Sequence, residues 1–425
     1  ARMIMTGEEF LGKEPFREVL VHATVMTEDG KRMSKSLGTG VDPLELIRLY
    51  GADATRFGLT SLVSESQDIR FKMQWKSGGK AGTGPGDELA RAEQIEQMRN
   101  FCTKLWNISR FALMNLGENP PPLRPLEELV WGEFSHGHWP DEDRHTAPRP
   151  GTPRHAPNTR LELADRWILS RFAAASAAVN DALDRYALGE ASWALYHFIW
   201  DELADWYLEL IKPRLRSEDA AVSGTAKDVL LHVLEATLRL AHPFLPFITE
   251  EIWQSLPGTE GALILQSYPG AHEDLRADEA EERMSATIEV VRAIRNLKSE
   301  LGAPNQAVDV HLSEDGRLER PYVEQSARAR IVEARPEGPA ATAIAAGVEI
   351  SLAVAGLVDV QAETARLRKE IDAAEKELKG VEGKLSNEQF VSRAPAEVVE
   401  KQRRIREELQ DRVGKLKERL RLFGG

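Results

Sequence analysis

Apolar residues recur at spacings of three and four along most of the chain, which is the period of an amphipathic helix. One such stripe predicts a helix over residues 98–111 and consists of Phe101, Leu105, Ile108 and Ala112. A later stripe is largely aromatic and consists of Trp193, Tyr196, Trp200, Leu203 and Tyr207. Aromatic rings can stack on unpaired nucleobases, but so regular a stripe is more typical of the core of a helix bundle. The pattern therefore predicts a mainly α protein.

Short runs of β-branched residues predict a few strands between the helices. Residues 19–25 form an apolar run that stops at the polar segment 27–30, which indicates a buried strand ending in a turn. Residues 308–312 and 348–352 alternate apolar and polar side chains, and they follow an amphipathic helix expected over 279–301. The apolar side of that helix consists of Ile288, Val291, Ile294, Leu297 and Leu301. Together these segments predict a small α/β connector over residues 276–355.

Residues 356–425 carry a heptad pattern. In the first expected helix, apolar residues are spaced alternately by four and three: Leu367, Ile371, Ala374, Leu378, Val381 and Leu385. After a break around residues 386–395, a second set continues in compatible register: Val398, Ile405, Leu409, Leu416 and Phe423. Because each helix alone would expose its seam, we expect an antiparallel coiled-coil arm, roughly 35–40 Å long at about 1.5 Å per residue.

Two segments interrupt the helical pattern. Residues 76–87 are rich in Gly and predict a linker, and the spacing Gly-x-x-x-x-Gly-Lys-Ser/Thr of a phosphate-binding loop does not occur in them. Residues 117–160 are rich in Pro, Gly and His and predict a loosely ordered insertion. Its histidines lack a rigid element that could hold them around a metal ion, so we expect no structural metal: His136, His138, His145 and His155. The predicted domains are residues 1–75, 88–275, 276–355 and 356–425.

Length and composition restrict the class of protein. A chain of 425 residues is too long for one core, and 42% hydrophobic with 29% charged residues is typical of soluble globular proteins. The single cysteine, Cys102, excludes an internal disulfide and a zinc site built from cysteines. We expect it to be a small core residue in a protein of the reducing cytosol. The net charge of −13 is uneven, because residues 361–425 carry +3 and the remainder carries −16. The C-terminal region is therefore the part best suited to docking on phosphates.

The most specific candidate for chemistry is the segment Arg32-Met33-Ser34-Lys35-Ser36. Two cationic side chains and two hydroxyls on a Gly-flanked loop suit the phosphates of a nucleotide, and ligand loops in open α/β sheets lie at the carboxyl ends of strands. A short basic segment can also be an ordinary surface turn, so the segment alone does not decide. Its continuation is more specific: Asp42-Pro43, then Tyr-Gly-Ala-Asp-Ala-Thr-Arg-Phe at 50–57, then Gln-Asp-Ile-Arg-Phe at 67–71.

Together these segments resemble the Lys-Met-Ser-Lys-Ser region of class I aminoacyl-tRNA synthetases, most closely the valyl-tRNA synthetase family. The resemblance implies that residues 1–75 are the C-terminal part of a Rossmann-like α/β catalytic domain whose loop binds ATP with its Mg²⁺. Lys35 would be the catalytic residue, because an ammonium that approaches the departing pyrophosphate stabilises the transition state more than the ground state. Arg32 stands where the family usually has its first lysine, so a planar fork replaces a point charge. The resemblance places Met33 near the adenine and gives hydroxyl contacts to Ser34 and Ser36.

The resemblance continues through the rest of the chain. Residues 98–111 resemble the first helix of the family's anticodon-binding bundle, and residues 383–391 resemble the hairpin of its tRNA-binding arm. The run His-Pro-Phe-Leu-Pro-Phe-Ile-Thr-Glu-Glu-Ile-Trp at 242–253 resembles a bundle segment of the valyl, isoleucyl, leucyl and methionyl enzymes, in which Thr249 would cap or open a helix. Polar residues of the first helix and basic residues of the arm are candidate tRNA contacts, with a solvated face as the alternative for each: Asn100, Lys104, Asn107, Arg110, Arg366, Lys369, Lys376, Lys384, Arg393 and Arg404.

The function implied is that of a monomeric, cytoplasmic valine–tRNA ligase, which joins L-valine to tRNA(Val) with the use of ATP. The family's His-x-Gly-His element and its editing domain precede the lysine loop, and neither occurs here; residues 136–138 have the wrong spacing and position. We therefore expect the C-terminal half of a larger enzyme, which alone binds tRNA weakly and forms no valyl-adenylate. One alternative is an isoleucyl or other class I synthetase, although isoleucyl enzymes commonly end in a cysteine zinc module. The other is a noncatalytic tRNA-binding or coiled-coil module.

Overall fold

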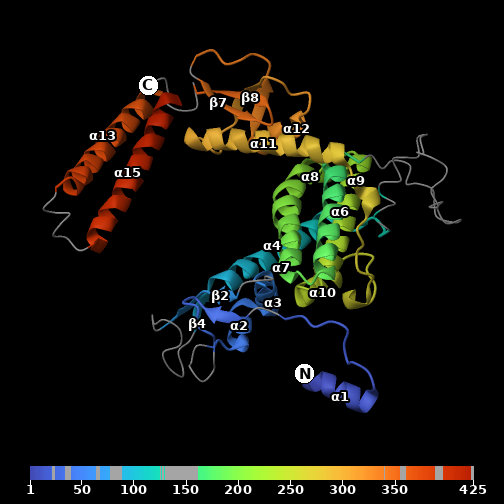
Figure 1. Ribbon diagram of the computed structural model, residues 1–425. Coiled ribbons are helices and arrows are strands. Elements are labelled where there is room, and N and C mark those ends of the chain that lie inside the picture. The colour runs from blue at the N-terminus through green and yellow to red at the C-terminus, as the bar shows by residue number, and fades with distance from the viewer. Residues whose placement is uncertain are drawn as a thin grey trace. The chain divides into compact units, whose positions relative to one another are not determined.

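The computed structural model consists of two largely helical units, residues 1–278 (unit 1) and residues 279–425 (unit 2) (Figure 1). It describes residues 1–21, 24–33, 40–63, 68–76, 89–124, 126, 129, 161–338, 340–354, 360–387 and 396–422. The strands of these residues form three small sheets. None of the helices in the described ranges is both long enough and apolar enough to cross a bilayer.

The N-terminal part of unit 1 combines short helices with short strands. Its elements are α1 (Arg2–Leu11), β1 (Val25–Thr27), α2 (Pro43–Tyr50), α3 (Ala52–Ser61), β2 (Ile69–Phe71), β3 (Met73–Trp75) and β4 (Leu89–Ala92). β1 pairs with β2 in parallel, with Val25 opposite Ile69, and β3 pairs with β4 antiparallel. Parallel neighbours need a crossover connection, which here contains α2 and α3.

The strand expected over residues 19–25 is wrong in its extent. β1 begins only at Val25, and Val19, Leu20 and Val21 lie outside any strand with 68, 53 and 86% of their surface exposed. A continuous apolar run becomes a buried strand only where other layers cover both of its faces. Among the described residues, β1 has β2 as its strand partner and these three side chains have no such cover.

The rest of unit 1 is a helix bundle. It contains α4 (Glu93–Leu116), α6 (Leu163–Asp184), α7 (Leu188–His197), α8 (Leu208–Leu215), α9 (Ala220–Ala241) and α10 (Pro246–Trp253), followed by the short 3₁₀ turns η2 (Leu263–Leu265) and η3 (Glu273–Leu275). A π-helical segment, η1 (Phe198–Tyr207), joins α7 to α8. The helix predicted over 98–111 is confirmed within α4, and its apolar stripe is buried: Phe101, Leu105, Ile108 and Ala112.

Unit 2 begins with α11 (Asp278–Glu300), which confirms the helix expected over 279–301; Ile288 is half-buried, and the other residues of its predicted stripe are buried. A four-stranded sheet follows in the order β6-β5-β8-β7, with β5 (Val308–Leu312), β6 (Ala329–Val332), β7 (Ala340–Ala345) and β8 (Val348–Ala353). β5 and β6 are parallel and are connected through α12 (Arg320–Ala327). β5 and β8 confirm the two strands that alternation predicts.

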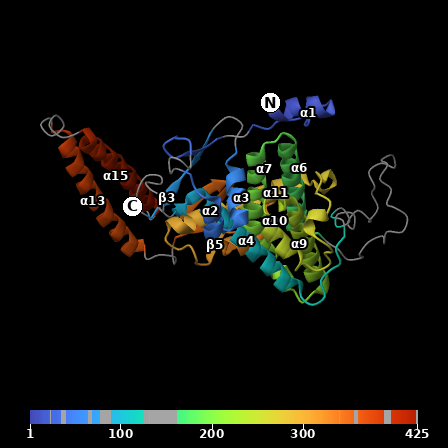
Figure 2. The same cartoon turned by 90° about the horizontal axis from the view of Figure 1, so that it is seen from below.

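The C-terminal helices α13 (Val360–Leu385) and α15 (Ala396–Leu422) lie side by side in both views (Figures 1 and 2). They run antiparallel, because the Nζ of Lys417 lies 2.6 Å from Glu375 Oε1 while Gln410, seven residues earlier, reaches Glu382. In α13 the expected seam residues Leu367, Ile371 and Ala374 are buried.

The register predicted for α15 is wrong at its start. Val398 is 41% exposed, and Val399 is buried in its place together with Leu409 and Val413. Two intervening seam positions hold Gln402 and Arg406, both half-buried. Polar residues at these two positions hide the heptad repeat when only apolar residues are followed. The apolar pattern therefore selected Val398 in place of Val399.

Candidate functional site

The signature segment, residues 32–36, begins at a tight turn that closes β1. The amide of Thr27 donates to Lys31 O over 2.9 Å, and the amide of Gly30 donates to Thr27 O over 2.9 Å. The buried Thr27 hydroxyl accepts a hydrogen bond from the Lys31 amide over 3.1 Å. Gly30 has a φ of 78°, a left-handed conformation that glycine adopts without strain. The turn therefore directs the chain out of the strand at Arg32, the first residue of the signature segment.

The same turn carries a small electrostatic cluster. The Thr27 hydroxyl, 2.5 Å from Asp29 Oδ1, and the Lys31 ammonium, 2.9 Å from Asp29 Oδ2, lower the pKa of the Asp29 carboxyl to about 2. Both charged side chains are largely exposed, so the pair contributes little to stability. The pair orders the turn locally. It also leaves the Lys31 ammonium paired with a carboxylate, directly before Arg32.

The far end of the loop is fixed by the start of α2. Asp42 is the N-cap residue, with Oδ1 accepting from the amide of Leu44 over 3.0 Å, and Pro43 occupies the first helical position. Of the predicted ATP-binding residues, Arg32 is exposed and Met33 is half-buried. Ser34, Lys35 and Ser36 lie outside the described residues. The structure thus describes the frame of the loop on both sides, the turn at 27–30 and the N-terminus of α2.

The next helix after α2, α3, is joined to the bundle through polar contacts. Asp53 is buried, and its carboxylate accepts from the amides of Phe247 (3.2 Å) and Ile248 (2.6 Å) in the first turn of α10. Arg56 Nη2 donates to Pro243 O over 3.3 Å. The expectation that Thr249 caps or opens α10 is wrong, because Thr249 lies within α10 and its hydroxyl donates to Leu245 O over 2.7 Å. The cap of α10 is supplied by α3.

Sequence reasoning missed the role of Asp53. The residue before Pro246 is Leu245, which has no side-chain group that could cap α10. A helix start without a capping residue is a signal that the cap comes from elsewhere. The signal does not name the partner, which lies 194 residues away in the sequence.

The polar candidates on α4 do not form one uniform surface. Asn100, Asn107 and Arg110 are exposed, but Lys104 is half-buried. The Lys104 ammonium lies 2.6 Å from Asp205 Oδ1 and 3.8 Å from the centre of the Trp200 ring. A lysine with an ion pair and a cation–π contact is less available to a phosphate than an exposed lysine.

The aromatic stripe is only partly core. Leu203 and Tyr207 are buried as predicted, whereas Trp193, Tyr196 and Trp200 are half-buried. The rings of Tyr196 and Trp200 stack at 5.6 Å with an interplanar angle of 6°. The π-helical segment η1 begins at Phe198, within this stripe, and has a different number of residues per turn from an α-helix. Residues at α-helical spacing therefore do not all face the core here.

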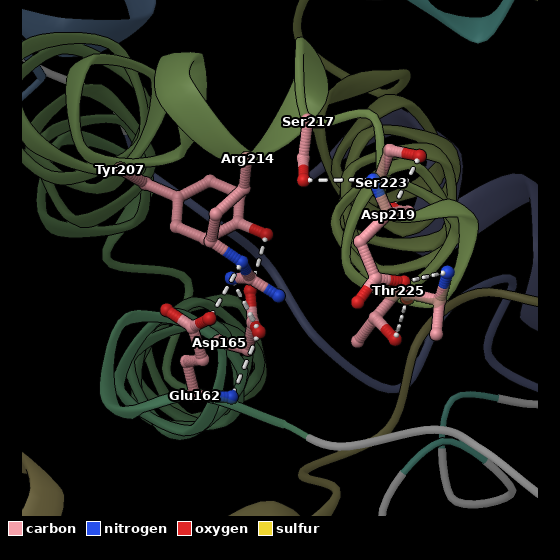
Figure 3. Close-up of polar contacts among 9 residues, drawn as sticks. Glu162, Asp165, Tyr207, Arg214, Ser217, Asp219, Ser223 and Thr225 are labelled. Atoms are coloured by element: carbon pink, nitrogen blue, oxygen red, sulfur yellow. Dashed lines mark hydrogen bonds and ion pairs between the residues drawn. The ribbon is translucent and has the colours of Figure 1, made fainter.

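An ionic network of buried Asp165 and Arg214 with exposed Glu162 joins the start of α6 to the end of α8 (Figure 3). The Arg214 guanidinium lies 2.7 Å from Asp165 Oδ2 and 3.1 Å from Glu162 Oε1, and the Tyr207 hydroxyl donates to Asp165 Oδ1 over 3.1 Å. Burial raises the pKa of the Asp165 carboxyl, and the Arg214 guanidinium opposes that rise. These ion pairs and this hydrogen bond all join residues of the bundle itself, which indicates a structural role. The neighbouring Asp219 caps α9 by accepting from the amide of Ala221 over 2.8 Å.

The basic candidates of the arm lie on its surface. Arg366, Lys369, Lys376, Lys384 and Arg404 are exposed, and Arg393 lies outside the described residues. Arg366 Nη1 is 2.7 Å from Glu370 Oε1 one turn along α13. Exposed pairs of this kind are weak and exchange readily with other anions.

Cys102 was expected to be a core residue, but it is only half-buried on α4. Burial raises the pKa of its thiol to about 12. A thiol that stays protonated is a poor nucleophile, so Cys102 is not a candidate for catalysis.

Three protein families match successive parts of this chain. The family described as tRNA synthetases class I (I, L, M and V) matches residues 1–72, the anticodon-binding domain of tRNA ligase matches residues 165–312, and the valyl tRNA synthetase tRNA binding arm matches residues 359–424. A chain in a solved LeuRS–tRNA–LeuAMS complex from Agrobacterium radiobacter K84 aligns with 65% of this chain and 27% of its own length, at 18% identity and a TM-score of 0.41. A likeness of that size carries no argument about the fold.

Relatives named Valine–tRNA ligase match nearly the whole chain. The protein from Carboxydothermus hydrogenoformans is 39% identical over 438 residues, 99% of this chain and 44% of the relative. Those from Geobacillus stearothermophilus and Bacillus subtilis are 36 and 35% identical over 99 and 98% of this chain, and 43 and 44% of their own lengths. The chain thus spans less than half the length of these relatives. On these matches, the chain belongs to the valyl-tRNA synthetase family of class I synthetases and corresponds to its C-terminal portion.

Proposed function

We propose that this chain carries the lysine loop and the tRNA-binding parts of a valine–tRNA ligase, and that the complete enzyme activates L-valine with ATP and Mg²⁺ and transfers it to tRNA(Val). The observation that supports this most strongly is the match of 98–99% of the chain to proteins named Valine–tRNA ligase. In this proposal β1, α2, α3 and β2 belong to a Rossmann-like catalytic domain, the bundle binds the anticodon region, and α13 with α15 form the antiparallel coiled-coil arm. The complete enzyme would act as a monomer in the cytoplasm.

Lys35 is the proposed catalytic residue, and Arg32, Met33, Ser34 and Ser36 are proposed to contact ATP with it. Replacing Lys35 by alanine in the complete ligase removes a cation aimed at charge that develops in the transition state, so the rate of ATP–pyrophosphate exchange should fall by about 10²–10³-fold. Lys31→Ala is the matched control, because it also removes an ammonium but one that pairs with Asp29 at 2.9 Å. Unchanged exchange in the Lys35 variant would refute the assigned role.

Arg366, Lys369, Lys376 and Lys384 of the arm are proposed to contact the tRNA backbone, together with Arg393, Arg404 and the α4 residues Asn100, Lys104, Asn107 and Arg110. The test is the salt dependence of tRNA(Val) binding by the 425-residue chain after replacement of the first four by glutamine. Each lost phosphate contact should reduce the slope of log K against log salt by about 0.7–0.9. A second variant removes the same charge from exposed residues outside the proposed set: Arg368, Lys379, Arg403 and Arg412. Equal slopes for the two variants would contradict the proposed contacts.

Two further measurements separate this function from its alternatives. A valine enzyme should charge and bind tRNA(Val) in preference to tRNA(Ile), and the reverse preference would indicate an isoleucyl enzyme. We expect no ATP–pyrophosphate exchange from the 425-residue chain alone, because the proposed ATP site also needs residues of the catalytic domain beyond this loop. Robust exchange by the isolated chain would refute that expectation. A complete protein that binds tRNA but never forms adenylate would be a noncatalytic module.

A further inference from the structure

A pocket of about 400 Å³ opens on unit 1 where α3, α9, α10 and the segment 263–268 meet. Figure 1 shows α3 and α10 close together at this end of the bundle. The volume lies within the range of roughly 300–1,000 Å³ that is usual for sites binding small molecules. Among the described residues that the sequence predicts to contact ATP or tRNA, none lines the pocket.

The charged side chains that line the pocket are cationic. Arg56 and Arg239 contribute guanidinium groups, and no Asp or Glu is among the described residues that line it. Arg56 is exposed and uses Nη2 to donate to Pro243 O. Arg239 pairs through Nη2 with Glu235 over 2.9 Å and donates from Nη1 to Ser267 O over 3.1 Å. Guanidinium groups bind phosphate through parallel N–H groups. The charge of the lining therefore favours an anion.

The pocket also offers hydrogen-bond acceptors of fixed orientation. The Thr249 hydroxyl uses its single proton for Leu245 O, so the contact of 2.8 Å to His242 Nδ1 requires that the imidazole donates from Nδ1. Nε2 of His242 is then an acceptor, and burial lowers the pKa of this histidine, which keeps the ring neutral at pH 7. Gln266 donates from its Nε2 to Glu260 O over 2.9 Å, which leaves its amide oxygen as another acceptor.

Apart from Ser267 and Tyr268, the remaining walls are apolar and continue onto the surface. Pro243, Pro246, Leu263 and Ile264 line the pocket, and Ile264 is 73% exposed at its rim. Phe247 is close by in the sequence and is 65% exposed. An exposed apolar patch next to polar residues is typical of a site that contacts a larger partner. A small free ligand would leave that patch in water.

We propose that this pocket binds one unpaired nucleotide of the tRNA, with the base against the apolar wall and His242, and the phosphate at Arg56 and Arg239. Proteins recognise RNA mainly through unpaired nucleotides, whose bases stack on flat side chains and whose edges form hydrogen bonds. The inference rests on the proposed function, because it names an additional contact with the same tRNA. Since α3 and the bundle both line the pocket, a bound nucleotide would contact the segment that follows the lysine loop and the anticodon-binding helices together.

The test uses a pair of adjacent exposed residues. Ile264→Glu places a carboxylate at the rim, and Leu265→Glu places the same charge one residue away, at a position that does not line the pocket. Both side chains are exposed, so neither change should unfold the protein. Loss of one stacked, phosphate-bound nucleotide should weaken binding of tRNA(Val) to the 425-residue chain at least about fivefold for Ile264→Glu. The Leu265 variant should change affinity less than about twofold.

A second pair tests the phosphate contact. Arg56→Gln removes the charge but keeps an amide that can donate to Pro243 O, and Arg48→Gln removes the same charge from an exposed position on α2. Only the Arg56 variant should reduce the salt slope of tRNA binding, by about 0.7–0.9. A photoreactive benzoylphenylalanine at position 264 should crosslink to a nucleotide in a loop of the tRNA.

The outcomes separate the pocket from the proposed function. If the unmodified chain binds no tRNA, the proposed function fails and the pocket proposal fails with it. If the chain binds tRNA(Val) but the two members of each pair behave alike, or position 264 crosslinks only to base-paired nucleotides, the pocket proposal alone is overturned. Binding of free nucleoside monophosphates as tight as that of tRNA would also overturn it, because the ligand would then be a free nucleotide.

Discussion

The contact between Asp53 and α10 makes a measurable prediction about the stability of unit 1. The Asp53 carboxylate is buried and accepts two amide hydrogen bonds from the first turn of α10. A hydrogen bond to a charged group contributes about 1.5–3 kcal/mol, and replacing a helix cap by alanine costs about 0.5–2 kcal/mol. Water can replace part of the lost contacts, because Phe247 is 65% exposed. Asp53→Ala should therefore lower the free energy of unfolding by about 2 kcal/mol.

Urea unfolding followed by tryptophan fluorescence measures this change in the right part of the molecule, since all nine tryptophans precede residue 279. Asp53→Asn keeps one acceptor oxygen and should cost about half as much as the alanine change. The control is Asp219→Ala, which removes an exposed cap that acts within α9 alone and should cost about 0.5–1 kcal/mol.

Hydrogen exchange gives a local measurement of the same contact. In Asp53→Ala, the amides of Phe247 and Ile248 should exchange faster, while those of α9 should keep their protection. The reasoning would be refuted if Asp53→Ala cost no more than Asp219→Ala, or if exchange at the start of α10 did not change.

Three further changes test other parts of the structure. Arg214→Met leaves the Asp165 carboxylate buried without its cation, so at pH 7 the free energy of unfolding of unit 1, measured in urea, should fall by about 3–5 kcal/mol. Burial raises the pKa of Asp165, so the folded state takes up a proton as the pH falls. The loss of stability should therefore become smaller towards pH 4. Equal losses at both pH values would contradict this. Cys102, with its thiol pKa near 12, is only about 10⁻⁴ thiolate at pH 8 and should react with a disulfide reagent only after urea unfolds unit 1. Val399→Asp should destabilise the antiparallel helices by about 3 kcal/mol or more in thermal melts followed by circular dichroism, whereas Val398→Asp should cost less than about 0.5 kcal/mol; the reverse order would restore the register read from the sequence.

The sequence predicted those elements whose apolar pattern is decided locally. The stripe of α4 and the alternation in β5 and β8 are each visible within one short window, because burial of one face imposes one period. The register of α15 was missed because Gln402 and Arg406 take seam positions that apolar residues usually hold. The extent of β1 was missed because the burial of an apolar run depends on neighbours that the run itself does not specify.

The candidate site was predictable in its residue types but not in its contacts. The signature segment and the Gly-Ala-Asp motif both stand out as sequence, yet nothing in either indicates that Asp53 caps a helix that begins at Pro246. The same holds for Lys104, whose charge made it a candidate for RNA, whereas its partners Asp205 and Trp200 come from a distant helix. Contacts between residues far apart in the sequence depend on how the helices pack, and no single segment of the sequence determines that packing.

The close packing around α3 has a consequence for the proposed catalysis. A Cβ on Gly58 would lie 2.5 Å from Ile95 Cδ1, and one on Gly189 would lie 2.2 Å from Val63 O. At such separations α3, α4 and α7 cannot slide past one another without opening the core. Together with the Asp53 cap, these contacts pack α3 closely against the bundle. If the proposed catalysis needs the lysine loop to move relative to the bundle, α3 should stay with the bundle. The N-cap at Asp42 would then resist that movement, and the left-handed Gly51 (φ 90°) would permit it.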